Sequence, residues 1–270
     1  MNNMFQKEAT VVKKEQLGPQ IHRLTFSAYE IARRAKPGQF VMLRAAQGLD
    51  PLLRRPFSIH QVTENGTLQI LFKIVGRGTQ YLASLSVGDI IDIVGPLGNS
   101  FTTGASGGHC LIGGGMGVAP MLFLAKEMIQ SNRPIELKVL LGAQTKDEIV
   151  SLLLNFSELG VEVLHATDDG SSGHHGFVTE LMEPALLKST EKVWNIHCCG
   201  PQPMLKQVAA ICEKKRWNCW VSMETMMACG IGACLGCTIR GADASLMPSS
   251  TNYLHVCKDG PVFSAVDIQW

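Results

Sequence analysis

The stretch Gly113-Gly114-Gly115-Met116-Gly117-Val118-Ala119-Pro120 decides the fold predicted for the central part of this chain. It follows an apolar run at 110–112 that predicts a strand, and it precedes residues 121–130, which predict a helix. Glycines in this position let the backbone approach a pyrophosphate, which the positive end of the helix then stabilises. The alternative is that they only allow the strand and the helix to pack closely. We expect Gly113, Gly114, Gly115, Met116 and Gly117 to bind a dinucleotide.

Strands and helices alternate from residue 109 to about residue 215. Further strands are predicted at 137–141, 161–166 and 193–199, and further helices at 146–157 and 203–214. This alternation is typical of a parallel α/β sheet. The last of these strands ends at Cys199-Gly200-Pro201, so these residues are expected at the same edge of the sheet as the glycines. Two interpretations of Cys199 stay open, namely the wall of a nicotinamide pocket and an ordinary buried thiol.

Residues 1–102 have a different pattern, in which short apolar runs are separated by turns. The runs at 11–12, 21–26, 40–43, 57–59, 68–72 and 90–94 predict strands, and Pro37-Gly38, Asn65-Gly66, Val87-Gly88-Asp89 and Gly95-Pro96-Leu97-Gly98 predict turns. Many short strands at even spacing indicate a closed antiparallel β-barrel. Residues 103–108 are rich in glycine and predict a linker to the α/β region.

Four cysteines near the C-terminus predict a metal centre. Cys229, Cys234 and Cys237 have the spacing C-x4-C-x2-C, and nineteen residues separate Cys237 from Cys257. The first three match the plant-type ligand spacing for a [2Fe–2S] cluster, and the small, glycine-rich residues between them suit a loop around it. A zinc site is one alternative, although only Cys234 and Cys237 form a C-x2-C pair. Four buried structural thiols are the other alternative.

Composition limits the classes of function. The 270 residues are 46% hydrophobic and 17% charged, as in a globular protein of two or three domains. A net charge of +1 gives no reason to expect nucleic acid or an anionic membrane surface as a partner. No apolar stretch approaches the ~18 residues that cross a bilayer, and the first residues lack a signal-peptide core. Nine cysteines, four of them clustered, favour metal ligation in a reducing compartment, so we expect a cytoplasmic protein.

Two short motifs in the barrel region suggest an anion site. Arg54-Arg55-Pro56-Phe57-Ser58 begins a predicted strand, and Gly76-Arg77-Gly78-Thr79 begins a predicted short helix. An arginine and a Gly-Thr helix start can together hold two phosphates, and a serine beside a flavin ring can offer it a hydrogen bond. Taken singly, these residues are equally explained as surface charges and a turn.

Together these motifs resemble the ferredoxin–NADP reductase superfamily, in which an FAD-binding barrel is joined to a pyridine-nucleotide domain. The resemblance rests on Arg55-Pro56-Phe57-Ser58, the glycine stretch at 113–120 and Cys199-Gly200-Pro201-Gln202-Pro203-Met204, in that order. Residues 227–234, Cys237 and residues 257–263 are similar to the electron-transfer subunits of class 1B dihydroorotate dehydrogenases. The likeness covers essentially the whole chain, although the gap before Cys257, at 241–253, is a few residues longer than in that family.

The resemblance implies three cofactors, FAD, a [2Fe–2S] cluster and NAD. It implies an FAD-binding β-barrel domain at 1–102, an NAD-binding parallel α/β domain at 103–216 and a small [2Fe–2S] domain at 217–270. The residues that it places against FAD are Arg55, Pro56, Phe57, Ser58, Leu71, Phe72, Lys73, Gly78 and Thr79.

The activity implied is electron transfer between a partner and NAD⁺. In the family, a separate FMN-containing subunit oxidises dihydroorotate to orotate in pyrimidine biosynthesis, and the electrons then pass through [2Fe–2S] and FAD. A heterotetramer is expected, and no residue of this chain is expected to act on the organic substrate. Closely related subunits of ferredoxin:NADP oxidoreductases, sulfide dehydrogenases or hydrogenases are the first alternative. A non-enzymatic, redox-sensing metal protein is the second.

NADH is expected in preference to NADPH, because residues 142–146 contain no arginine that could clamp a 2′-phosphate, although Lys146 keeps NADPH open. The nearest candidates for a ribose-binding acid, Asp147 and Glu148, are interpreted as acids in the first turn of a helix. Glu224 is interpreted as a structural hydrogen-bond acceptor.

Overall fold

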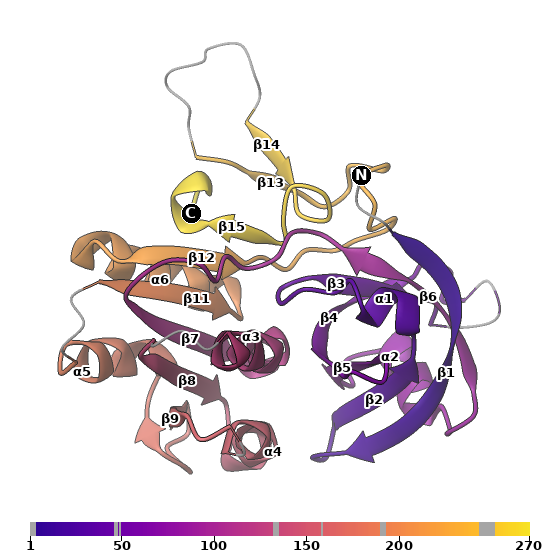
Figure 1. Ribbon diagram of the computed structural model, residues 1–270, viewed down its shortest axis with the longest axis horizontal. Coiled ribbons are helices and arrows are strands. Elements are labelled where there is room, and N and C mark those ends of the chain that lie inside the picture. The colour runs from indigo at the N-terminus through magenta and orange to yellow at the C-terminus, as the bar shows by residue number, and fades with distance from the viewer. Residues whose placement is uncertain are drawn as a thin grey trace.

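A computed structural model describes residues 4–45, 48, 50–131, 135–157, 159–189, 193–242 and 252–270. Figure 1 shows a barrel and an α/β layer side by side, with the C-terminal residues lying across the top. Most of the segment 241–253, which lengthens the gap before Cys257, lies outside the described residues.

Six antiparallel strands close the N-terminal barrel in the order β1-β2-β5-β4-β3-β6, which confirms the predicted barrel. Its elements are β1 (Phe5–Gln16), β2 (Ile21–Ser27), α1 (Tyr29–Ala32), β3 (Phe40–Leu43), β4 (Arg55–Val62), β5 (Thr67–Lys73), α2 (Arg77–Ser84) and β6 (Ile90–Leu97). Leu24, Phe26, Ile59, Ile70 and Ile93 fill the interior and have no exposed surface. Burial of these large apolar side chains stabilises the closed barrel.

The turn predicted at residues 95–98 is wrong, because β6 continues through Leu97. Gly95 pairs with Phe5 of β1, and Leu97 pairs with Phe40 of β3. A Cβ atom at Gly95 would lie 2.7 Å from Val41 Cγ1, so glycine is needed here for close packing of the barrel wall. The glycine and proline therefore mark a crowded part of the strand and not its end.

A seven-stranded sheet forms the second layer, in the order β10-β9-β8-β7-β11-β12-β15. Every neighbouring pair is parallel except β12 and β15, which confirms the predicted parallel α/β sheet. Its elements are β7 (Gly108–Gly114), the 3₁₀ turn η1 (Gly115–Val118), α3 (Ala119–Gln130), β8 (Leu137–Ala143), α4 (Lys146–Ser157), β9 (Glu162–Thr167), β10 (His174–His175), η2 (Val178–Leu181), α5 (Met182–Leu186), β11 (Trp194–Cys199), α6 (Gln202–Lys215), β12 (Asn218–Ser222) and β15 (Val262–Ser264). None of the helices in the described part of the chain is both long and apolar enough to cross a membrane.

Alternation along the central strands divides the apolar side chains between two helical layers. Cys110 and Ile112 of β7 pack with α5 and α6, whereas Leu111 packs with α3 and α4. The α3–α4 layer also packs against Ile21 and Leu71 of the barrel. The barrel and the sheet therefore share an apolar interface.

The C-terminal residues extend the sheet. β12 and β15 are its last two strands. Between them the chain forms a loop at 223–237, called here the cysteine loop, and then the hairpin of β13 (Thr238–Arg240) and β14 (Tyr253–His255). The 3₁₀ turn η3 (Ala265–Asp267) follows β15. Val256, Phe263 and Ile268 are buried in the core that contains β7 and β11. Packing on the sheet thus supports a segment too short to form a core alone.

Two buried histidines link the stability of this fold to pH. His60 Nδ1–H donates to the Ala119 carbonyl oxygen at 2.7 Å and joins β4 to α3, and His197 stacks on His109 and Trp220. Burial lowers the pKa of His60 to about 4 and that of His197 to about 3. The unfolded chain binds these protons near pH ~6.5. The stability due to neutral imidazoles is therefore present above that pH and is lost as the pH falls toward 4.

We expect the free energy of unfolding to be constant above pH 7 and to fall by about 2 kcal/mol per buried imidazole by pH 5. Urea midpoints measured between pH 8 and pH 5 will check this. His60→Gln keeps a donor for the Ala119 oxygen but cannot take up the proton, so its midpoint should fall less. A flat wild-type profile, or equal slopes in the two proteins, would contradict the assignment.

Candidate functional site

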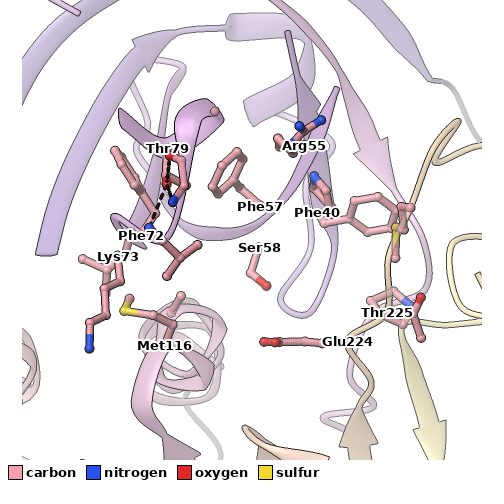
Figure 2. A pocket seen from close by; sticks show the side chains of 18 of the residues that line it. Phe40, Arg55, Phe57, Ser58, Phe72, Lys73, Thr79, Met116, Glu224 and Thr225 are labelled. Atoms are coloured by element: carbon pink, nitrogen blue, oxygen red, sulfur yellow. Dashed lines mark hydrogen bonds between the residues drawn. The ribbon is translucent and has the colours of Figure 1, made fainter. Parts of the chain in front are cut away.

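A cavity of about 640 Å³ lies between the barrel and the sheet. All nine residues predicted to contact FAD line it, namely Arg55, Pro56, Phe57, Ser58, Leu71, Phe72, Lys73, Gly78 and Thr79. Figure 2 shows this cavity, with Arg55 and Thr79 at one end and Met116 and Glu224 at the other. Residues of all three predicted domains therefore meet around one site.

The end of the cavity at the start of α2 suits a pyrophosphate. A Cβ atom at Gly78 would lie 3.3 Å from Arg55 Nε, so the arginine rests directly on the helix start. In the described part of the chain, Arg55 Nη1 donates to the Leu53 main-chain oxygen at 2.6 Å, whereas both Asp50 carboxylate oxygens hold Arg77. An arginine without a carboxylate partner beside a helix N-terminus is a suitable anion site.

Thr79 lines the same end of the cavity, but its hydroxyl group forms hydrogen bonds with the main chain at the start of α2. Thr79 Oγ1 accepts from the N–H groups of Val75 at 2.9 Å and Gly76 at 3.1 Å, and it donates to the Gly76 oxygen at 2.9 Å. Thr79 therefore fixes the first turn of α2, on which Arg55 rests.

The opposite end brings a serine, a thiol and a carboxyl group together. Figure 2 shows Ser58 and Glu224 on facing sides of the cavity. The buried Cys199 thiol donates to Glu224 Oε1 across 4.0 Å. Burial, and then the Glu224 carboxylate, raise the pKa of Cys199, and burial raises the pKa of Glu224. These groups can hold a proton at the edge of a bound ring.

Glu224 accepts a hydrogen bond, as interpreted from the sequence, but its place in the cavity wall was not predicted. Glu224 follows β12, and Ser222 of that strand pairs with Cys199 of β11. The two strand ends therefore lie side by side at the cavity. Since no strand was predicted at 218–222, this neighbourhood could not be inferred from the sequence.

A second cavity, of about 470 Å³, lies at the carboxyl ends of β7, β8 and β9. Of the predicted nucleotide residues, Gly114, Gly115, Met116 and Pro201 line it, whereas Gly113, Gly117, Cys199 and Gly200 are not among its lining residues. A Cβ atom at Gly117 would lie 2.2 Å from the Cys199 oxygen, so Gly117 lets the turn press against the end of β11. Gly115 has a φ of +53° and open space around it, as a backbone that approaches a phosphate requires.

Two carboxylates line this nucleotide cavity. The Asp168 N–H, just after β9, donates to the Ala143 oxygen at the end of β8, at 3.1 Å. Glu148 lies in the first turn of α4, as predicted, and pairs with Lys73 at 2.5 Å. A ribose-binding acid is expected at the end of the second strand of such a fold, so Asp168 was not among the predicted residues. The sequence signal for Asp168 is its position directly after the third strand of this region, β9, because the end of β9 lies beside the end of the second strand, β8.

The four predicted metal ligands form two neighbouring pairs. Cys229 lies beside Cys234 near the surface, and Cys237 lies beside Cys257 in the interior. In a [2Fe–2S] cluster each iron takes two protein ligands, so this grouping fits two irons.

Main-chain N–H groups of the loop point at the sulfur atoms. Ile231 donates to Cys229 Sγ at 3.4 Å, and Gly232 donates to Cys257 Sγ at 3.1 Å. Burial opposes ionisation of Cys229, but the loop N–H groups favour its thiolate, and its pKa falls to about 6. Burial and the neighbouring Cys237 thiol raise the pKa of Cys257 to about 12. Binding of iron at Cys257 must therefore release a proton.

The cysteine loop lies next to the large cavity. A Cβ atom at Gly230 would lie 2.6 Å from Met42 Cγ, so the loop rests on the barrel strand β3. Met227 lines the cavity and precedes Cys229 by two residues. The cluster site and the cavity are thus connected by one short piece of backbone.

Three family models match successive parts of the chain. The family described as the iron–sulfur cluster binding domain of dihydroorotate dehydrogenase B matches residues 224–269. An oxidoreductase FAD-binding domain matches residues 8–101, and an oxidoreductase NAD-binding domain matches residues 111–210. The protein is an oxidoreductase whose cofactors are FAD, NAD and an iron–sulfur cluster, as predicted.

Similar proteins extend over the full length. The dihydroorotate dehydrogenase B (NAD(+)) electron transfer subunit of Desulforamulus reducens is 37% identical over 272 residues, which cover 100% of both chains. The subunit of the same name from Geobacillus thermodenitrificans is 38% identical over 264 residues, 96% of each chain. The structure of an NADH-dependent reduced ferredoxin-NADP oxidoreductase covers 97% of this chain and 90% of its own, with a TM-score of 0.83 and 28% identity. The chain therefore belongs to the family of dihydroorotate dehydrogenase B electron transfer subunits.

Proposed function

We propose that this protein carries electrons from the FMN of a catalytic partner through [2Fe–2S] and FAD to NAD⁺, and so supports oxidation of dihydroorotate to orotate in pyrimidine biosynthesis. The arrangement of its three sites in series carries this proposal. Met227 lines the large cavity just before Cys229, and Met116 lines both the large cavity and the nucleotide cavity. The names of the full-length relatives support dihydroorotate as the source of the electrons.

The bound cofactors supply the conversion between hydride transfer and single-electron transfer. The residues of this chain hold and orient them. Arg55 and the start of α2 are placed to hold the FAD pyrophosphate, and Gly115 lets the nucleotide pyrophosphate approach the backbone. Cys199 and Glu224 are placed to keep a proton beside the flavin ring, opposite Ser58. Cys229, Cys234, Cys237 and Cys257 are the proposed cluster ligands.

The proposed partner docks on the cysteine loop. Met226 is 90% exposed, and Leu235 and Ile231 are 56% and 48% exposed, around the surface pair Cys229 and Cys234. Neighbouring exposed apolar side chains are typical of protein contact surfaces. A catalytic subunit that covers them would bring its FMN close to the outer iron site. Two copies of each subunit, in a heterotetramer, are the proposed assembly.

The proposed domains remain 1–102, 103–216 and 217–270. The end of β6 at Leu97 and the start of β7 at Gly108 support the first boundary. The second boundary separates two sequence segments of one sheet, because β12 pairs with β11. A cytoplasmic location is proposed from the cysteine content, since all nine thiols are free of disulfides.

Activity of the isolated chain tests the proposal. Loaded with its cofactors, it should reduce ferricyanide with NADH but should not oxidise dihydroorotate, because the orotate site is assigned to the partner. Addition of the FMN subunit should then yield NADH from dihydroorotate and NAD⁺. Oxidation of dihydroorotate by the isolated chain would overturn the assignment of the orotate site to the partner subunit.

The position of Asp168 favours NADH over NADPH. Its carboxylate can accept hydrogen bonds from ribose hydroxyls and would repel a 2′-phosphate. We expect Asp168→Ser to reduce the ratio of kcat/KM for NADH to that for NADPH by about tenfold, which corresponds to ~1.4 kcal/mol. Asp169→Ser is the matched control, because that carboxylate is bound by Ser171. An unchanged ratio in Asp168→Ser would contradict this role.

The structural similarity to an NADH-dependent reduced ferredoxin-NADP oxidoreductase supports a second candidate function. The same three sites would then serve a large flavoprotein partner, and ferredoxin would replace dihydroorotate at the far end of the chain of cofactors. The identity of the protein that binds the cysteine loop decides between the two functions.

A further inference from the structure

We propose that Met116 is a movable partition between the nicotinamide and flavin sites, and that its side chain must swing aside before hydride transfer. The proposal rests on the FAD and NAD sites proposed above. In the described part of the chain, Met116 and Lys73 are the two residues that line both cavities. Figure 2 shows them together at the end of the flavin cavity that lies away from Arg55.

Hydride transfer requires the two cavities to join. The reacting atoms of nicotinamide and flavin must approach to roughly 3–3.5 Å, so no protein side chain can remain between them. In the structure the flavin and nucleotide cavities, of about 640 and 470 Å³, are distinct and have Met116 and Lys73 in common. Part of the shared wall must therefore move when the nucleotide binds.

Lys73 is the fixed part of this wall. Its ammonium group pairs with the Glu148 carboxylate at 2.5 Å, and the two side chains are only 30% and 21% exposed. Moving Lys73 would break a charge-assisted hydrogen bond that is largely sheltered from water. In the described part of the chain, the Met116 thioether takes part in no comparable hydrogen bond or ion pair, and methionine has three rotatable side-chain bonds.

The backbone beneath Met116 is also fixed. Gly117 is pressed against Cys199, and Val118 is buried. His60 of the barrel holds the carbonyl group of Ala119 at 2.7 Å. The backbone of this turn therefore cannot move away from the cavities as a rigid unit, so the Met116 side chain must move instead.

Separation of the two domains would be a more costly way to join the cavities. Polar contacts cross the interface at several points besides Lys73–Glu148. Arg23 of β2 donates to Asn155 of α4 at 2.5 Å, and the Ser151 hydroxyl of α4 donates to the Leu17 main-chain oxygen. A side-chain rotation, which takes picoseconds to nanoseconds at accessible positions, leaves all of these contacts intact.

Three substitutions at position 116 separate the effect of side-chain motion from that of side-chain size. Met116→Ile is apolar and of similar volume but is branched at Cβ and stiff at χ1. Met116→Leu is the matched control, since it has similar volume without branching at Cβ. Met116→Ala removes the partition.

The rate of flavin bleaching by saturating NADH, followed by stopped-flow absorbance, is the principal measurement. Long-wavelength absorbance on addition of NADH reports stacking of nicotinamide on flavin, and a separate titration gives the affinity for ADP-ribose. Each variant is compared at equal flavin content, so that a folding defect is recognised. Failure of the wild-type protein to bleach with NADH would overturn the underlying sites as well.

We expect Met116→Ile to bleach at least tenfold more slowly and to lose the long-wavelength absorbance, with affinity for ADP-ribose within twofold of wild type. Met116→Leu should bleach at nearly the wild-type rate, and Met116→Ala should bleach at least as fast as wild type. Wild-type rates in Met116→Ile would overturn the proposal. A slow Met116→Ala would also overturn it, because the contacts of the side chain and not its motion would then matter.

Discussion

Replacement of Cys237 by alanine is expected to abolish electron transfer between the partner and NAD⁺ while leaving NADH oxidation by artificial acceptors largely intact. Cys237 is 2% exposed and belongs to the inner ligand pair with Cys257. Changes to groups that merely orient metal ligands cost about 10- to 100-fold, so loss of a ligand should cost more than about 100-fold. The FAD and nucleotide cavities do not include Cys237 in their walls, and the NADH half-reaction should persist.

Iron content, visible absorbance and the two activities are the measurements for this variant. Cys212→Ala is the matched control, because Cys212 is an equally buried thiol in the same core but is not a proposed ligand. It should lower the free energy of unfolding by about 1 kcal/mol and keep its full iron content. Retention of two irons and of partner-dependent activity by Cys237→Ala would refute the ligand assignment.

Replacement of Arg55 by methionine is expected to weaken FAD binding. The arginine rests on the start of α2 and has no carboxylate partner in the described part of the chain, so its charge is available to the pyrophosphate. A hydrogen bond to a charged group contributes about 2 kcal/mol, which predicts a roughly 30-fold rise in the FAD dissociation constant. Methionine keeps much of the apolar stem of the side chain while removing its charge.

Flavin retained after gel filtration, and titration of the stripped protein with FAD, will measure this effect. Arg55→Lys should recover only part of the affinity, because a lysine lacks the planar fork of arginine. Arg33→Met serves as the control, since Arg33 stacks over Tyr29 in the barrel and does not line the FAD cavity. Equal FAD affinity in Arg55→Met and wild type would contradict the pyrophosphate assignment.

Local sequence patterns predicted most of the fold. The helix predicted at 146–157 is observed with the same limits, and the predicted strand at 40–43 is β3. Short apolar runs separated by turns identified the barrel, because a barrel strand is short and ends at a tight turn. Strand–helix alternation identified the sheet in the same way. These signals lie within ten or so consecutive residues, so they can be read without knowledge of distant contacts.

The remainder depended on contacts between distant residues. β12 and β15 join the sheet although they are short, because they pair with strands already in place. Glu224 lines the large cavity only because β12 is aligned with β11. Asp168 reaches the nucleotide cavity because the end of β9 adjoins the end of β8. Neither acid stands in a sequence motif that marks its role.

Glycine and proline were misread where packing, and not a turn, required them. At 95–98 both residue types occur, yet β6 continues through Leu97, which pairs with Phe40. Gly95 is required because Val41 leaves no room for a side chain at this position. The opposite holds at Gly115, where the space is open and the backbone conformation is the requirement. The same residue type thus has two physical causes, which only the surrounding structure distinguishes.

Anaerobic affinity isolation of the protein from its own cells, followed by assay of the complex with dihydroorotate and NAD⁺, tests the proposed electron path most directly. We expect an FMN-containing subunit to accompany the chain, and the complex to form NADH from dihydroorotate. The same complex carrying Cys237→Ala should form none. A complex with a different flavoprotein, active with ferredoxin and inactive with dihydroorotate, would contradict the proposed function.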